Sequence, residues 1–235
     1  MNNDEIENPI PEMLDAPMKI FVDQVGYRPA DEKVAVLTFP ASRFSVTDAD
    51  GRQVLSGDVT SAGFDAASGE NVWHADLSAL RTPGVYRVNA DGESSVTFEI
   101  GENVFRDCFD KCMKAFYFQR CGCELTPEYA GPWTHGKCHC GRALLWENTS
   151  VKLEVSGGWH DAGDYGRYVT AAATALAHLL YSWKLYPKVF RKQDINIPGK
   201  PSEMPDVLIE CRYELEWLLK MQRYDGAVWR KATTA

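Results

Sequence analysis

The sequence predicts two folding units of different class, an all-β sandwich followed by a unit built from α-helices. The first observation is a series of short alternating runs, separated by turn pairs such as Asp50-Gly51, that continues to about residue 100. The second is a switch of the apolar period, near Asn103, from two residues to between three and four. We therefore divide the chain into a leader at 1–18, a β-sandwich at 19–101 and a helical unit at 103–235.

Composition and charge exclude several classes of protein. The 235 residues are 45% apolar and carry a formal net charge of −8 without a basic run, which argues against a nucleic acid as partner. No stretch approaches the roughly 18 uninterrupted apolar residues of a transmembrane helix, so we expect no membrane partner. The leader is acidic and contains prolines, so we expect it to be disordered. It lacks the features of a secretory signal peptide, which leaves a cytoplasmic location and export by an unrecognised route both open.

Strands are predicted in the first unit from runs rich in β-branched and aromatic residues. The clearest runs are Ile20–Val22, Val34–Leu37, Phe44–Val46, Val85–Val88 and Val96–Ile100. Asp50-Gly51 lies between two strands and Asp91-Gly92 precedes the last one. Five to seven short strands in about 80 residues are typical of a small sandwich.

Three helices are predicted in the second unit. The first stops near Gly122, the second is limited by Pro187 and the third ends at Asp225-Gly226. The residues expected on their buried faces are Phe105, Phe109, Cys112 and Phe116, then Val169, Ala172, Leu176, Leu179 and Trp183, then Leu208, Cys211, Leu215 and Leu218. On the third helix we expect Arg212, Glu214 and Glu216 to face outward. The irregular region 122–163 is too rich in glycine, tryptophan and cysteine to be an idle linker.

The run Gly157–Tyr168, GGWHDAGDYGRY, is the most informative stretch of the chain. It places Asp161 and Asp164 three residues apart among four glycines, an imidazole and three aromatic rings. Glycines allow sharp turns and close approach to a ligand, and aromatic faces beside carboxylates suit a sugar ring. The two carboxylates can share one water in one cleft. The simpler interpretation is that Asp164 caps a helix beginning near Tyr165, which leaves Asp161 unexplained.

The seven cysteines all follow residue 107, and their odd number does not suit a disulfide framework. Without an export signal, reduced thiols and a metal site are the better expectation. A set of two thiols and two imidazoles suits structural zinc, although its spacing is not that of a zinc finger: Cys121, Cys138, His139 and His160. Rival ligands are Cys123, Cys140 and His135. We expect the remaining cysteines to be core residues of helices, namely Cys108, Cys112 and Cys211.

The Gly157–Tyr168 run closely resembles the catalytic-base signature of glycoside hydrolase family 9, the cellulase-type inverting enzymes, because both aspartates and the glycine spacing match in order. The opening Val22–Pro29 resembles the start of the immunoglobulin-like domain that precedes many of these catalytic domains. The resemblance covers nearly the whole chain from residue 19. It implies an immunoglobulin-like β-sandwich followed by the N-terminal portion of an all-α (α/α)6 barrel of inner and outer helices, truncated at its C-terminal side.

The resemblance also implies roles for individual residues. Asp164 is the general base and Asp161 orients the attacking water. Zinc, as a structural cofactor, is held by Cys121, Cys138, His139 and His160, and calcium is a candidate cofactor for the part of the domain beyond residue 235. The proton donor of the family is a glutamate in that later part, and nothing singles out Glu154 or Glu203 here. We therefore expect the 235 residues alone to be inactive.

The implied substrate is a β-glucan. Candidates for stacking on glucosyl rings are Trp159, Tyr165, Tyr168 and Trp133, with core packing an equal alternative for each. The expected activity of the complete enzyme is that of a monomeric endo-β-1,4-glucanase that hydrolyses cellulose or related β-glucans with inversion. One alternative is an exo-acting relative that trims cello-oligosaccharides or glucosamine oligomers. The other is a non-catalytic, zinc-stabilised carbohydrate-binding module.

Overall fold

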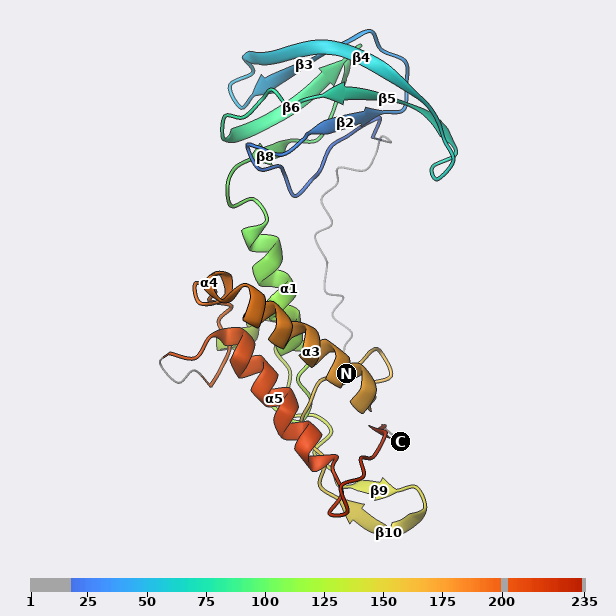
Figure 1. The fold of residues 1–235 in the computed structure, drawn as a ribbon, viewed down its shortest axis with the longest axis vertical. Helices are drawn as coiled ribbons and strands as arrows, with labels where there is room; N and C mark the ends of the chain where they lie inside the picture. The colour runs from blue at the N-terminus through green and yellow to red at the C-terminus, as the bar shows by residue number, and fades with distance from the viewer. Residues whose placement is uncertain (1–17, 200–202, 234–235) are drawn as a thin grey trace, which may run out of the picture. The chain divides into compact units, whose positions relative to one another are not determined.

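The computed structural model describes residues 18–199 and 203–233 (Figure 1). The predicted leader, apart from Met18, lies outside these residues. The boundary between two compact units falls between Cys108 and Phe109. Among the described residues, no helix is long and apolar enough to cross a bilayer.

The first unit is an antiparallel β-structure in which one long strand belongs to two sheets. Strand β4 (Gln53–Asp65) pairs with β3 (Arg43–Asp48) through Asp58 and with β5 (Glu70–Asp76) from Val59 onward. The strand order is β1-β2-β5-β4-β3-β6-β7, and β8 also pairs with β6. The remaining strands are β1 (Ile20–Phe21), β2 (Val34–Leu37), β6 (Gly84–Ala90), β7 (Glu93–Ser94) and β8 (Phe98–Ile100).

Alternation of side chains builds the core of this unit. β2, β3 and β6 each turn every second residue inward, and the buried set includes Leu37, Val46 and Val88. The turn from β6 to β7 uses Asp91 and Gly92, with φ of 46° and 84°, as a two-residue hairpin turn requires. The predicted runs coincide with β1, β2, β3, β6 and β8. The sequence does not single out β4 or β5 because β4 is polar and largely exposed.

The second unit contains the three predicted helices, α1 (Arg106–Phe118), α3 (Val169–Leu185) and α5 (Asp206–Lys220). α3 and α5 pack side by side (Figure 1). β11 (Arg167–Tyr168), just before α3, pairs with β12 (Lys231–Ala232). The shorter elements are α2 (Pro127–Ala130), the 3₁₀ helix η1 (Gly131–Trp133), β9 (Ala143–Leu145), β10 (Asn148–Leu153) and α4 (Pro187–Phe190).

The predicted inward face of α3 is confirmed, with Ala172, Leu176 and Leu179 buried. On α1, however, Met113 and Tyr117 are the buried residues, and the predictions that Cys108 and Cys112 are core residues are wrong, because both are exposed.

The predicted face of α5 is also partly wrong. Cys211 is buried as expected, but Glu214 is buried and Leu215 is exposed. The reason is that the buried face carries three carboxylates one helical turn apart, Asp206, Glu210 and Glu214, together with Trp217. A search for an apolar stripe therefore places the face about one residue away from its true position.

Glu214 is the group that we expect to make stability depend on pH. Its oxygens are buried and meet no hydrogen-bond partner among the described residues. Burial raises the pKa of Glu214 to about 7, the nearby Glu210 carboxylate acts in the same direction, and the Arg167 guanidinium opposes it. Because this pKa lies above the ordinary value of 4.5 for glutamate, the folded state holds a proton that the unfolded state releases, and stability falls as the pH rises from about 4.5 to about 7.

Glu214→Gln should therefore raise the melting temperature at pH 8 and bring no gain at pH 4. At about 1.4 kcal/mol per pKa unit, the gain is limited to about 3.5 kcal/mol. Thermal unfolding at both pH values measures it, and Glu216→Gln, at an exposed position on the same helix, controls for the loss of one negative charge. An equal gain at pH 4 and pH 8 would contradict the assignment.

Candidate active site

The aspartate run, residues 157–168, is anchored to the segment that follows α1. Cys121 N donates to Gly158 O at 2.7 Å, and His160 N donates to Gln119 O at 2.8 Å. Arg120 and Trp159 form an antiparallel bridge between these two contacts. Backbone hydrogen bonds thus fix the position from which the chain turns into Asp161.

Asp161 and Asp164 lie on one closed turn and are both exposed. Asp161 N donates to Gly166 O at 2.8 Å, and Tyr165 N donates to Ala162 O at 3.0 Å. α3 begins only at Val169, with Tyr168 at its N-cap position. The interpretation of Asp164 as a helix cap is therefore wrong, because a strand separates the aspartate from the helix.

Asp164 is held by two hydrogen bonds. Tyr168 Oη donates to its Oδ2 at 2.7 Å, and Gly166 N donates to its Oδ1 at 3.0 Å. These bonds, that of Tyr168 first, hold the pKa of Asp164 below its usual value, and the same contact raises the pKa of Tyr168. The result is an oriented, exposed carboxylate that is ionised at neutral and mildly acidic pH.

A cavity of about 220 Å³ opens beside this turn and is lined by Asp161, His160 and Tyr168 together with residues of α1 and α3. The four predicted stacking residues differ in their exposure. Tyr165 and Trp133 are exposed, and Tyr168 is the partner of Asp164. Trp159 is 6% exposed and packs against Phe116, so that only part of it reaches the cavity. A stacking role for these residues stays a prediction.

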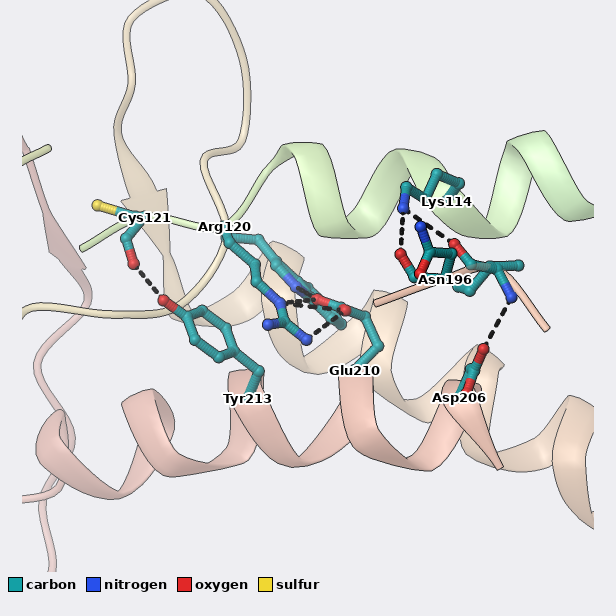
Figure 2. Close-up of polar contacts among 9 residues, drawn as sticks. Lys114, Arg120, Cys121, Asn196, Asp206, Glu210 and Tyr213 are labelled. Carbon is teal, nitrogen blue, oxygen red and sulfur yellow. Dashed lines mark hydrogen bonds and ion pairs between the residues drawn. The ribbon is translucent and has the colours of Figure 1, made fainter. Parts of the chain in front are cut away.

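Beneath the turn lies a buried ion pair that sequence reasoning missed. Glu210 of α5 accepts hydrogen bonds from Arg120 Nη2 at 2.8 Å and Arg120 Nε at 3.1 Å, and from Trp159 Nε1 at 2.8 Å. Figure 2 shows Arg120 and Glu210 meeting between the segment after α1 and helix α5. Tyr213, one turn further along α5, donates to Cys121 O. The sequence signal that could have revealed this ion pair is the repeat of acidic residues every four positions on a helix with an apolar face.

The structure brings together the four residues predicted as metal ligands. Ligand atoms of Cys121, Cys138, His139 and His160 all lie within 4.8 Å of one another. His160 Nε2 is buried and has no hydrogen-bond partner among the described residues. A buried, unpaired nitrogen beside two thiols and a second imidazole fits a cation of the zinc type, which prefers four nitrogen and sulfur ligands.

The rival ligands lie differently. Cys140 Sγ donates to the Cys138 and Gly122 carbonyls, His135 Nδ1 contacts Gly136 O, and Cys123 is half-buried. Burial lowers the pKa of His160 to about 4 and raises the pKa of the Cys121 thiol to about 12. Burial therefore keeps the imidazole neutral, as a metal ligand must be, whereas a bound cation would be needed to ionise the thiol.

Glu154 does not have the properties of a proton donor. Ser156 and Lys220 bind its carboxylate and lower its pKa to about 2, with the Ser156 hydroxyl as the largest cause. A general acid must hold its proton near neutral pH, which requires a shift in the other direction.

Comparison with known proteins decides the family. The model for glycosyl hydrolase family 9 matches residues 105–233, and the model for the cellulase N-terminal ig-like domain matches residues 15–95. The chain belongs to glycosyl hydrolase family 9. The family match contains the whole aspartate run, the ion pair and the candidate metal ligands.

Curated relatives and solved structures agree with this assignment. A cellodextrinase of Butyrivibrio fibrisolvens is 42% identical over 92% of this chain and 40% of its own length, and Endoglucanase D of Acetivibrio thermocellus is 34% identical over 89% and 34%. A Bacteroides ovatus GH9 structure superimposes with a TM-score of 0.84 at 33% identity, covering 91% of this chain and 41% of that one. A Zn-binding triple mutant of GH family 9 endoglucanase J30 gives a TM-score of 0.79 at 37% identity, over 87% and 40%. The chain thus spans about two fifths of the length of these relatives.

Gly158 should be intolerant of any side chain. Its φ is 76°, and a Cβ would lie 2.6 Å from Cδ2 of Trp217 on α5. Gly158→Ala should therefore cost on the order of 2–4 kcal/mol, from overpacking together with left-handed strain. Gly163→Ala, at a position with open space, should change stability by no more than about 0.5 kcal/mol. Denaturant unfolding of both variants measures the difference, and equal losses would contradict this account of the turn.

Proposed function

We propose that the protein carrying this chain hydrolyses β-1,4-glucosidic bonds of cellulose or related β-glucans with inversion of configuration. In this mechanism Asp164 removes a proton from the water that attacks the anomeric carbon, and Asp161 orients that water. The carboxylic acid that protonates the leaving oxygen is a glutamate outside this chain. Its distance from the base must leave room for a water, on the order of 6.5–9.5 Å between carboxyl groups.

The observation that carries the proposal is the state of Asp164. Its carboxylate is exposed to incoming water, fixed by Tyr168 and Gly166, and held ionised by those same hydrogen bonds. A base with these properties suits proton abstraction from water, whereas a carbohydrate-binding module has no need of one. Asp161 on the same closed turn, beside the cavity, supplies a second acceptor for the same water.

The wider architecture belongs to the same proposal. We place helices α1, α3 and α5 as the first helices of an (α/α)6 barrel, with the immunoglobulin-like unit at 19–101 as its N-terminal neighbour and a monomer as the active species. Support comes from the two family models and from the helical unit that follows residue 103.

A second candidate is hydrolysis of short cello-oligosaccharides by exo action. The specific support is the similarity to a cellodextrinase, at 42% identity, compared with 34% to Endoglucanase D. Viscometry on carboxymethylcellulose separates the two candidates, because an endo enzyme rapidly lowers the viscosity of the polymer and an exo enzyme does not.

Zinc is the metal that we propose for the Cys121, Cys138, His139 and His160 cluster. Bound there, zinc supplies a structural crosslink without chemistry of its own in hydrolysis. The chain's own residues then join three segments, because Cys121 follows α1, Cys138 and His139 precede β9, and His160 belongs to the aspartate run. The His160 ring lies 5.1 Å from that of Tyr165, between centroids, so the crosslink ends directly beside the catalytic turn.

Removal of the metal should lower thermal stability, because metal binding and folding are coupled. Prolonged chelation should lower the melting temperature, and Cys138→Ser should reproduce that loss and be insensitive to chelator. Cys211→Ser, at a buried thiol of the helical core, should lose packing only and keep its full response to chelator. Elemental analysis that finds no zinc in well-folded protein would refute the proposal.

Asp164→Ala should nearly abolish hydrolysis in the complete enzyme, with a loss of about 10²–10⁴-fold in kcat from the missing base. Azide needs no deprotonation, so it should partly restore turnover and give the α-configured glycosyl azide from a β-linked substrate. Asp161→Ala should also lose most activity, with weaker rescue by azide, because it changes where the nucleophile sits. Rate measurements with and without azide, with product configuration determined by NMR, test both expectations. Full activity of Asp164→Ala would refute the assignment of the base.

A further inference from the structure

We infer that Glu210 is a positioning residue, which fixes the catalytic turn from beneath through Trp159 and Arg120. This inference rests on the function proposed for Asp164 and Asp161 and adds a residue that contacts neither of them.

Glu210 is buried, and an ionised carboxylate in such a place needs hydrogen-bond donors around it. Its side chain is fully buried, and the Arg120 side chain is 6% exposed. Three donor atoms converge on its two oxygens, Arg120 Nε, Arg120 Nη2 and Trp159 Nε1, at 2.8–3.2 Å. Arg120 in turn lies over the ring of Tyr213, with Cζ 4.5 Å from the centroid. Such an arrangement is geometrically specific, because two nitrogens of the planar guanidinium meet the two oxygens of the carboxylate.

The path from Glu210 to the reacting groups is short. Arg120 and Trp159 are bridge partners on two neighbouring segments, so one carboxylate holds side chains from both of them. Trp159 is two residues before Asp161, and the backbone on either side of it is bonded to Cys121 and Gln119. The side-chain contact to Glu210 therefore controls how the chain leaves Trp159 and enters the turn of Asp161 to Gly166.

A second buried carboxylate on the same helix holds a different part of the chain. Asp206 is a buried carboxylate on the same helix, one turn earlier, and accepts a hydrogen bond from Ile195 N at 2.8 Å. Its contact stabilises the loop before α5, which is separate from the aspartate run. The two residues thus form a matched pair, similar in burial and charge but different in what they hold.

The test uses the complete, metal-loaded enzyme with the variants Glu210→Gln, Trp159→Phe and Asp206→Asn, and with folded protein quantified in each sample. Trp159→Phe keeps an aromatic ring at this position while it removes the donor to Glu210, so it provides a second measurement if Glu210→Gln folds poorly. Because small misplacement of a catalytic group is costly, Glu210→Gln should lower kcat by about 10- to 100-fold. Trp159→Phe should lower kcat in the same direction, with KM changing less than kcat in both variants. Asp206→Asn should lose stability and keep kcat within about twofold.

A double-mutant cycle with Asp164→Ala separates positioning from general destabilisation. If Glu210 acts through the orientation of Asp164, its substitution should cost less than threefold in the azide-free Asp164→Ala background. Equal fold losses in both backgrounds would overturn the inference, as would a kcat of Glu210→Gln or Trp159→Phe within twofold of wild type. A wild-type enzyme without β-glucanase activity would refute the proposed function itself. A loss of kcat in Asp164→Ala without a loss of kcat in Glu210→Gln would refute the inference alone.

Discussion

The helical unit depends on one desolvated ion pair, that of Arg120 and Glu210. Burying two charges is costly, and their attraction offsets that cost only when the geometry is good and the remaining hydrogen-bonding groups are satisfied. Here the Glu210 carboxylate also accepts from the Trp159 indole, and the Arg120 guanidinium lies against the rings of Tyr117 and Tyr213. Loss of one partner would leave an uncompensated buried charge, which typically costs about 3–5 kcal/mol. The pair therefore stabilises the fold only when α5, the end of α1 and the aspartate run lie together.

Two neighbouring residues transmit this constraint to the candidate active site. Trp159 is tied to α5 through Glu210, while His160 clusters with Cys121, Cys138 and His139. Asp161 is the next residue, so the catalytic turn starts from a dipeptide whose side chains are held by two independent sets of contacts. Gly158 completes the arrangement, because its lack of a side chain lets the backbone pack directly on Trp217. Pre-organisation of this kind is what an orientation-dependent water attack requires.

The sequence predicted the parts of this structure that follow from periodicity and from a specific motif. Apolar spacing located α1, α3 and α5, and the glycine-rich run located both aspartates. The ligand chemistry of thiols and imidazoles, together with the resemblance, located the cysteine and histidine cluster. Prediction from the sequence failed where polar residues are buried or where a strand lacks apolar residues. Glu214 was assigned to solvent because a charged side chain is normally exposed, and β4 was missed because its polar residues show no alternation. The start of α3 was misplaced because β11 is formed by pairing with β12, more than 60 residues later in the chain, which no local pattern reveals.

The carboxylates of the helical unit fall into two classes, one exposed to solvent and one buried. Asp161 and Asp164 are exposed, and a hydroxyl and a backbone amide stabilise Asp164 as an anion. Glu210 and Glu214 are buried one turn apart on α5, yet only Glu210 has a guanidinium bonded to it. Glu214, without such a partner, has a raised pKa and tends to be neutral. A protonated Glu214 avoids a second negative charge beside Glu210, so that Arg120 has a single anionic partner there. The raised pKa of Glu214 therefore limits the negative charge buried on α5 beside the Arg120 and Glu210 pair, while the carboxylates of the aspartate run face solvent.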